Sequence, residues 1–451
     1  MTTPAALLPA LLVFTVYAAA QPSGTGFTTL HDFKGTPSDG ANPWANLAIG
    51  ASGVLYGTTF YGGSSSAGTV FSLTPPESPG GVWTEAVLYN FSFVSNGGAY
   101  GPTDLVISSA PGGYPVLYGV TEGGRGEKGG GPCCGTVFSL TPPVPGTGPA
   151  WTYKTLYRFN NADGYGPKGV AFGNDGVLYG ATAFGGASNN GTVFSLTPPA
   201  TSQEPWTETV LYSFTGGSDG GDPFSGVAVG QGPGGQTVLY GTTAHGGING
   251  NGTVFSLTPP AASGGPWTET VLHAFTGGAD GIGPGAGVAI GQNGSLYGTT
   301  YFGGAGPCTA PESPGCGTVY ALKPPASPDG AWIETVLYSF MYTDGSNPRA
   351  GVALQSAPGG EVLYGTTSEG GIHSCVGLSG CGTVFSLTPP ASGTGALWTD
   401  TVLHYFTGNS DGSGPSAGIM IGTGPGGHTT LYGTAYAGTS QHDGTVFQLT
   451  P

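Results

Sequence analysis

Gly191-Thr-Val-Phe-Ser-Leu-Thr-Pro-Pro199 is the stretch that decides the fold of this chain, because it recurs, with drift, from one end to the other. It is followed by Trp206-Thr-Glu-Thr-Val-Leu-Tyr-Ser-Phe214, Gly226-Val-Ala-Val-Gly230 and Leu239-Tyr-Gly-Thr-Thr243. The Leu-Tyr-Gly triplet measures the period, and its tyrosines are Tyr56, Tyr118, Tyr179, Tyr240, Tyr297, Tyr364 and Tyr432. Seven copies at a nearly fixed period indicate a repeat architecture.

Each copy holds four short segments rich in Val, Thr, Tyr and Phe, separated by Gly, Pro, Asn and Asp, which is typical of β-strands and turns. In 209–214, Val210, Tyr212 and Phe214 are expected on one side of a strand and Leu211 on the other, by two-residue alternation. Four strands in each of seven units predict an all-β, seven-bladed β-propeller of four-stranded antiparallel blades. A linear β-solenoid is the competing architecture.

The two ends of the chain favour a closed ring. Phe27-Thr-Thr-Leu-His-Asp-Phe33 matches the fourth strand of the repeat, and Gly444-Thr-Val-Phe-Gln-Leu-Thr-Pro451 matches the third. The last blade therefore lacks its outermost strand, and we expect the N-terminal strand to supply it. That pairing also covers a sheet edge that would otherwise be open to other chains.

Composition limits the partners and the compartment. The formal charge is -16 and only 7% of residues are charged, which argues against nucleic acid and anionic membranes as partners. Residues 1–20 have the apolar core and small-residue end of a signal peptide, and no later run is long enough to cross a bilayer. We expect 21–451 to be a single secreted or periplasmic propeller, monomeric, that ends at its last repeat without an anchor.

The six cysteines fit an oxidising compartment. They lie in three loops between the second and third strands of a repeat. Local disulfides Cys308–Cys316 and Cys375–Cys381 are the simplest pairing. Cys133 and Cys134 could form a vicinal disulfide or remain free thiols. Zinc is disfavoured because neither a Cys-x-x-Cys pair nor clustered His accompanies them.

The unit SDGANPWANLAIG…GVLYGTTFYGGSSSAGTVFSLTP, residues 38–75, resembles the GloVer (Gloeobacter–Verrucomicrobia) tandem repeat of secreted bacterial proteins. The resemblance covers essentially all of 26–451, because Asp-Gly-x-x-Pro, Leu-Tyr-Gly-Thr-Thr, Gly-Gly and Gly-Thr-Val-Phe recur in that order. The resemblance to this family implies no particular activity for the chain, because the family has no established activity. The layout is also similar to kelch propellers, some of which are copper oxidases, but their metal-binding tyrosines and histidines have no matching cluster in this sequence.

Strands of a blade alternate in direction, so the second-to-third and fourth-to-first loops emerge on one face, which also carries the cysteines. The fourth-to-first loops repeat an aspartate: Asp39, Asp163, Asp219, Asp280, Asp344 and Asp411. A ring of these carboxylates could bind Ca²⁺, although one carboxylate per loop is few for a site of 6–8 oxygens. The favoured interpretation is that each aspartate caps its own turn, and no cofactor is expected.

Positions that vary between repeats are the better candidates for a binding site, because the ring does not need them for its own structure. Trp44, Lys168, Phe224 and Arg349 follow the proline of the fourth-to-first loop, as do Thr103, Gly285 and Ser416. A second variable set precedes the Gly-Gly pair: Tyr61, Glu122, Phe184, His245, Phe302, Glu369 and Tyr436. Aromatic rings beside charged donors suit a polysaccharide or another extracellular partner.

An extracellular carbohydrate-active enzyme, a hydrolase or a lyase, is the alternative function, with Glu122, Glu369 and His245 as weak catalytic candidates. A glycosidase needs its two carboxylates roughly 5–9.5 Å apart, and Glu122 and Glu369 belong to blades three steps apart. His31, His273 and His404 take a position that is Tyr in other repeats, so we expect them to pack rather than react. The leading hypothesis is a binding or scaffold propeller; a purely structural module remains a third.

Overall fold

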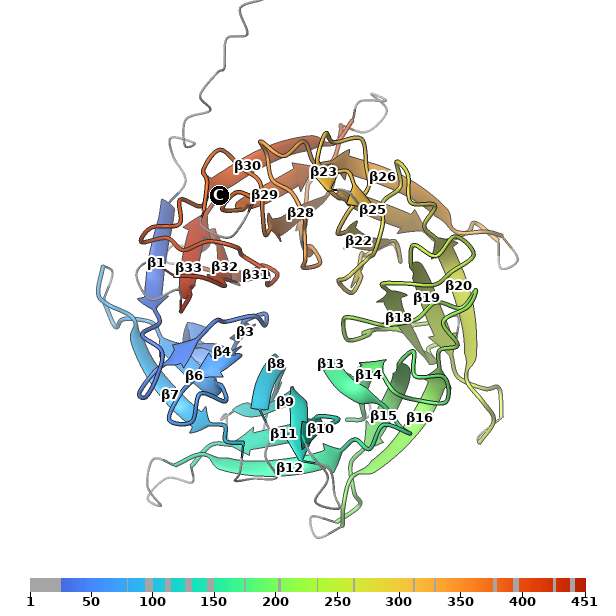
Figure 1. Cartoon of the computed structure of the whole chain (residues 1–451), viewed down its shortest axis with the longest axis horizontal. Helices are drawn as coiled ribbons and strands as arrows, with labels where there is room; N and C mark the ends of the chain where they lie inside the picture. The colour runs from blue at the N-terminus through green and yellow to red at the C-terminus, as the bar shows by residue number, and fades with distance from the viewer. Residues whose placement is uncertain are drawn as a thin grey trace, which may run out of the picture.

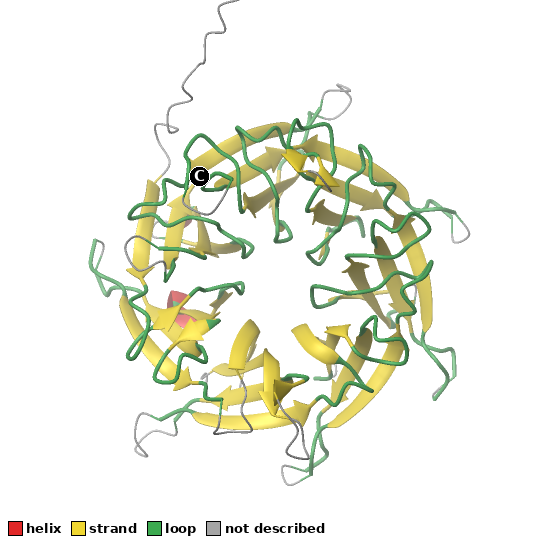
Figure 2. Ribbon diagram, in the orientation of Figure 1, coloured by secondary structure: helices red, strands yellow, loops and turns green. Residues whose placement is uncertain are grey.

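The computed structural model describes residues 26–451 except 79, 94–99, 110–114, 126–131, 144–149, 174–175, 202–203, 233, 263, 311–312, 328–329, 376–378, 392–396, 425–426 and 439–442. The segment expected to be a signal peptide, 1–20, lies outside the described residues. Seven sheets of antiparallel strands surround a central axis (Figure 1). Figure 2 shows strands and loops almost throughout, with one short helical turn, η1 (Ala51–Gly53), in the described part. The predicted seven-bladed β-propeller is confirmed.

The strands of each blade follow one another from the axis outward, in chain order. Blades one and two contain β3 (Ala48–Ile49), β4 (Leu55–Thr59), β6 (Thr69–Thr74), β7 (Thr84–Asn90), then β8 (Tyr100–Ser109), β9 (Pro115–Arg125), β11 (Thr136–Thr141), β12 (Thr152–Arg158). Blades three and four contain β13 (Tyr165–Phe172), β14 (Leu178–Phe184), β15 (Thr192–Thr197), β16 (Thr207–Ser213), then β17 (Ala228–Gln231), β18 (Thr237–Thr243), β19 (Thr253–Thr258), β20 (Thr268–Ala274). Blades five and six contain β21 (Ala289–Ile290), β22 (Leu296–Thr300), β25 (Thr318–Lys323), β26 (Ile333–Ser339), then β27 (Ala353–Ala357), β28 (Gly360–Thr367), β29 (Thr383–Thr388), β30 (Thr399–Tyr405).

The seventh blade closes the ring. It contains β31 (Met420–Thr423), β32 (Thr429–Ala435), β33 (Thr445–Thr450) and, outermost, β1 (Gly26–Asp32). In Figure 1 the blue β1 lies beside the red β33, and Phe27 pairs with Leu449 in antiparallel register. The expectation that the N-terminal strand completes the last blade is confirmed. Short extra strands lie in the loops: β2 (Gly40–Ala41), β5 (Tyr61–Gly62), β10 (Pro132–Cys133), β23 (Thr309–Ala310) and β24 (Ser313–Pro314).

The hydrophobic core is divided among the interfaces between neighbouring blades. Phe194 on β15 packs edge-to-face on Phe159 of the preceding blade, with ring centroids 5.0 Å apart. A Cβ atom at Gly180, in the Leu-Tyr-Gly triplet of the next strand inward, would lie 2.5 Å from the Phe194 ring. The triplet therefore needs glycine so that an aromatic ring can lie flat across it. Equivalent aromatic pairs lie at the other six interfaces: Phe33–Phe71, Phe91–Phe138, Phe214–Phe255, Phe275–Tyr320, Phe340–Phe385 and Phe406–Phe447.

The alternation expected in the fourth strand holds only in part. The register between β15 and β16 shifts between Val193 and Phe194, which is the mark of a β-bulge. Because of that shift, Phe214 is fully buried whereas Val210, expected on the same side, is 37% exposed. Val210 was therefore wrongly placed. A bulge recurs at the corresponding place in the other six blades.

Two of the expected disulfides are present, Cys308–Cys316 and Cys375–Cys381. Both lie in loops between the second and third strands, as predicted. The choice between a vicinal disulfide and free thiols at Cys133 and Cys134 lies outside the described residues, because the side chain of Cys133 is not among them. In the part of the chain that the structure describes, no helix has the length and hydrophobicity for a membrane crossing.

Candidate functional site

A cavity of about 960 Å³ occupies the centre of the ring and is lined by residues of all seven blades. The residue that follows the loop proline lines it in every blade: Trp44, Thr103, Lys168, Phe224, Gly285, Arg349 and Ser416. The structure thus brings the four predicted ligand-binding residues, Trp44, Lys168, Phe224 and Arg349, around one space. Its rim comprises the second-to-third and fourth-to-first loops.

The loop proline explains this placement. In the third blade, a Cβ atom at Gly191 would lie 2.6 Å from Cδ of Pro223, the loop proline of the fourth blade. Gly191 also has a φ of +89°, which glycine adopts without strain. The proline of the next blade therefore packs directly against the glycine of Gly-Thr-Val. The rigid proline ring in turn directs the following residue towards the cavity.

On one side of the cavity the charges are balanced. The Lys168 ammonium lies 2.5 Å from Oε1 of Glu122 and 5.3 Å from the centroid of the Phe224 ring. The Lys168 side chain is only 13% exposed. Phe224 packs edge-to-face on Phe184, at a ring separation of 6.1 Å. The ion pair and the aromatic ring hold the lysine in place.

On another side the positive charge is not balanced. Nη2 of Arg349 donates to the hydroxyl of Tyr301 at 2.5 Å, and its guanidinium lies 5.0 Å from the same ring. Nε of Arg349 is buried without a hydrogen-bond partner. Among the described residues, no carboxylate forms an ion pair with Arg349. Arg349 therefore retains donor capacity and a net charge towards the cavity.

Tyr436 lies near this arginine, and Trp44 packs on Tyr436. The Trp44 ring is 5.4 Å from that of Tyr436 and 5.9 Å from that of Phe60, yet the residue is 41% exposed. Burial raises the pKa of Tyr436, and the positive charge of Arg349 partly opposes that rise. An exposed indole and an unbalanced cation therefore line the same cavity, and Tyr436 interacts with both.

The inner surface of the cavity has two polar side chains that the sequence analysis missed. Oδ2 of Asp104 accepts from the backbone N–H of Val170 at 3.0 Å, and Oδ1 of Asn46 accepts from Gly418 at 2.6 Å. Burial raises the pKa of Asp104 to about 6. Aligning the repeats would have revealed both residues, because the same position is glycine in the other five: Gly169, Gly226, Gly287, Gly351 and Gly418.

The catalytic candidates are not gathered into one site. Glu122 directly follows the last residue of the second strand that pairs with the third, as Phe60 and Tyr301 do in their blades. Glu369 and His245 lie one residue further along the chain from that pairing. The second variable set was therefore misaligned at Glu122 and Tyr436, because Gly123 and Ala437 occupy the positions in their blades that His245 and Glu369 occupy in theirs. Glu122 and His245 line the cavity, but Glu369 does not. Sequence reasoning also missed Tyr301 and Phe60, which do.

The six loop aspartates lie away from the cavity, each within its own blade. Oδ2 of Asp219 accepts from the backbone N–H of Thr215 at 2.8 Å, and Oδ1 accepts from the Thr215 hydroxyl at 2.5 Å. The histidine or tyrosine of the same outer strand contacts this carboxylate, as in Tyr212 to Asp219 at 3.1 Å. Comparable contacts hold the other five: His31–Asp39, Tyr157–Asp163, His273–Asp280, Tyr338–Asp344 and His404–Asp411.

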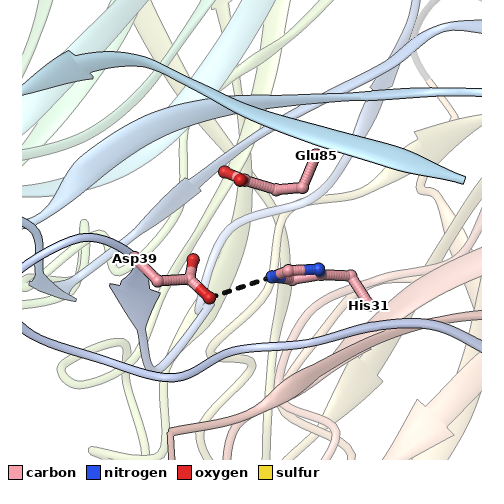
Figure 3. Close-up of side chains that lie close together, drawn as sticks. All are labelled: His31, Asp39 and Glu85. Atoms are coloured by element: carbon pink, nitrogen blue, oxygen red, sulfur yellow. Dashed lines mark hydrogen bonds and ion pairs between the residues drawn. The ribbon is translucent and has the colours of Figure 1, made fainter.

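An acidic side chain from the next blade approaches five of these six pairs. Figure 3 shows one case, in which Glu85 of β7 faces His31 and Asp39. The five acids are Glu85, Glu208, Glu269, Glu334 and Asp400, and each has one carboxyl oxygen that is buried without a hydrogen-bond partner. Burial, followed by the charge of the facing aspartate, raises the pKa of four of them to about 7: Glu208, Glu269, Glu334 and Asp400.

Comparison with known proteins identifies the repeat and the fold. The model of the Gloeobacter/Verrucomicrobia repeat matches residues 127–375. A PL25 polysaccharide lyase, an ulvan lyase, is similar over 92% of this chain and 95% of its own, with 11% identity and a TM-score of 0.51. The α-L-arabinofuranosidase of Fusarium graminearum is similar over 94% of this chain and 97% of its own, with 11% identity and a TM-score of 0.43. No match was found among curated proteins. At such identities the structural similarity concerns the fold alone.

Proposed function

Because this chain belongs to the Gloeobacter/Verrucomicrobia repeat family and folds as a seven-bladed propeller, we propose that it is a secreted binding protein whose central cavity holds an acidic polysaccharide. The observation that carries the proposal is Arg349, a guanidinium that lines the cavity without a carboxylate partner among the described residues. The whole chain has only eight Lys and Arg residues against a net charge of -16. An unbalanced cation at the cavity of such a protein supports an anionic ligand, because guanidinium forms strong paired hydrogen bonds with carboxylate and sulfate groups.

The aromatic residues support a carbohydrate rather than a small anion. Trp44 presents an exposed indole at the mouth, and Phe224, 39% exposed, lies in another blade. The apolar face of a sugar ring packs well on such a surface, while its hydroxyls need polar partners at the edge. Lys168, Glu122 and Asn46 offer those partners along the cavity wall. Enzymes that act on polysaccharides share this fold, which is an analogy and adds no residue-level argument.

Binding is tested with the whole secreted chain against a panel of polysaccharides that includes uronic-acid, sulfated and neutral members. We expect acidic members to bind more tightly than neutral ones, with an affinity that falls as salt is raised. Arg349→Gln should weaken the binding of acidic members about 10- to 100-fold, the range for a hydrogen bond to a charged group. Trp44→Ala should weaken acidic and neutral members alike.

The matched control is Lys323→Gln, which removes an exposed cation at the end of β25 outside the cavity and should leave affinity unchanged. Equal losses in Arg349→Gln and Lys323→Gln would mean that only overall charge matters, and the cavity would no longer be the binding site. Tight binding that Arg349→Gln and Trp44→Ala both leave intact would contradict the proposal as well.

A carbohydrate-active enzyme is the second candidate, and Asp104 is the observation that favours it. Its carboxyl lines the cavity and has a pKa of about 6, so it can hold or release a proton near neutral pH. Glu122 provides a second carboxylate on the same cavity. A hydrolase or lyase would release reducing ends or unsaturated uronates from the polysaccharides that bind, and Asp104→Asn should abolish that release. If a polysaccharide binds and no product is released, the protein acts as a binding protein and the enzyme alternative is rejected.

A further inference from the structure

We propose that His31, Asp39 and Glu85 form a binding site for a divalent metal ion of the zinc class, at the seam where the N-terminal strand closes the ring. The three residues come from two neighbouring blades and the loop between them. His31 lies on β1, the outermost strand of the seventh blade, and Asp39 lies in the loop that follows. Glu85 lies on β7, the outermost strand of the first blade. A shared ion would therefore join the seventh blade to the first.

The ligand atoms are close enough to share one ion. Nε2 of His31 lies 3.1 Å from Oδ2 of Asp39, and one atom from each of the three residues lies within 4.8 Å of the others. Two ligands at bond lengths of ~2.0–2.1 Å and a tetrahedral angle are ~3.3–3.4 Å apart. The histidine and aspartate already have nearly this separation, and Figure 3 shows Glu85 across from the pair. Glu85 supplies the third protein ligand.

The unpartnered oxygen of Glu85 is a second observation at the seam, because there the glutamate belongs to a close group with a histidine and an aspartate. Oε1 of Glu85 is buried and has no hydrogen-bond partner. With neutral imidazole the three side chains carry two negative charges, and no Lys or Arg among the described residues forms an ion pair with Asp39 or Glu85. Two carboxylates partly shielded from water need a balancing cation or a proton. A divalent ion would neutralise both and give Oε1 a partner.

The other blade interfaces offer an internal comparison. At four of them tyrosine replaces the histidine, and in three of these the tyrosine hydroxyl already donates to the loop aspartate. At the His404–Asp411 interface the acid is replaced by Phe27, whose ring stacks on His404 at 3.8 Å. His273, Asp280 and Glu334 repeat the residue types, but their ligand atoms do not form a three-membered group as close as that of His31, Asp39 and Glu85. Of the described residues, only the seam provides one nitrogen and two carboxylates at ligand spacing.

The donor set selects the class of ion. One imidazole nitrogen and two carboxylate oxygens suit Zn²⁺ and neighbouring transition metals, with water completing the coordination. Ca²⁺ would require 6–8 oxygens, more than these residues supply. With the metal at Nε2, the neutral imidazole of His31 carries its single proton on Nδ1.

The test is titration of the metal-free, full-length protein with Co²⁺ and then Zn²⁺. We expect about one equivalent of Co²⁺ to give visible absorption bands that Zn²⁺ abolishes. We also expect Zn²⁺ to raise the Tm by about 3–5 °C at a free concentration ~100 times Kd. His31→Tyr installs the residue found at four equivalent positions, so it should fold, and it should lose the bands and the Tm increase. Glu85→Gln should weaken Co²⁺ binding at least about 10-fold, within the range for a lost ligand or its orienting partner.

His404→Tyr is the matched control, because the same substitution is made at an interface that has no third acid, and it should leave binding unchanged. Asp39 is not substituted, since it also caps its own turn through the backbone N–H of Gly40 at 2.6 Å. The proposal is overturned if the wild-type protein gives no bands and no Tm increase. It is also overturned if His31→Tyr and His404→Tyr bind metal equally, which would place the ion elsewhere.

Discussion

At the scale of single residues, Tyr320 is the one departure from phenylalanine at the centre of the third strand. The equivalent positions are Phe71, Phe138, Phe194, Phe255, Phe385 and Phe447. Its ring keeps the shared packing, 5.2 Å from the Phe275 ring, and is fully buried. Its hydroxyl, however, is buried without a hydrogen-bond partner, and burial raises its pKa well above the usual range. The hydroxyl therefore imposes a desolvation cost that the other six blades avoid.

We predict that Tyr320→Phe raises the free energy of unfolding by about 1 kcal/mol, because it removes an unsatisfied buried hydroxyl and keeps the ring. Denaturant unfolding measures the change. Tyr338→Phe is the contrasting variant, since the Tyr338 hydroxyl donates to Asp344 at 2.5 Å and its loss should destabilise the protein. A lower stability for Tyr320→Phe would mean that its hydroxyl has a structural role.

At the scale of elements, acidic side chains on the outer strands lie close to the loop aspartates of the preceding blade. Glu208 of β16 faces Asp163 of the preceding blade, and Glu269 of β20 faces Asp219. Burial and the facing charge raise the pKa of each glutamate to about 7, from an ordinary value near 4.5. Glu334 and Asp400 behave in the same way. The folded protein therefore holds protons that the unfolded chain has already released between about pH 4.5 and 7.

We predict that the Tm falls as pH rises from about 5 to 8. A raised carboxyl pKa contributes stability that is complete below the unfolded pKa and is lost as pH rises through the folded one. His273, whose pKa is lowered by burial, acts in the opposite direction but is a single group. Glu208→Gln combined with Glu269→Gln should flatten the decline, whereas Glu77→Gln, at an exposed turn, should not. A Tm that rises across this range would contradict the prediction.

At the scale of the whole molecule, the ring is held together by the same contact at every interface, including the seam. Phe33, directly after β1, is 2% exposed and packs edge-to-face on Phe71 of the first blade at 5.1 Å. Phe214 packs on Phe255 at 5.0 Å inside the continuous chain. The seam is therefore packed as closely as an interface between consecutive blades.

We predict that Phe33→Ala and Phe214→Ala each lower the free energy of unfolding by about 3–5 kcal/mol, the range for truncating a buried phenylalanine. Equal losses, measured by denaturant unfolding, are expected if the seam opens only when the whole ring unfolds. A much smaller loss for Phe33→Ala would mean that the N-terminal strand separates before the rest.

The sequence by itself determined the architecture. The sequence contains seven repeats, and Gly and Pro bound its strands. Its two ends carry complementary strands of one blade, so local patterns sufficed to predict a closed propeller. It also placed Trp44, Lys168, Phe224 and Arg349 around one face, because residues that follow a rigid proline at one point of a repeat must occupy equivalent places around the ring.

Only the tertiary structure decided what those residues contact. The pairing of Lys168 with Glu122, the unbalanced charge of Arg349 and the approach of Glu85 to His31 all join residues from different blades. The bulge that exposes Val210 and the one-residue offset that separates Glu122 from Glu369 likewise depend on register between strands. Such contacts depend on how neighbouring sheets pack and twist together, whereas the periodicity of a sequence records only which way each residue faces along its own strand.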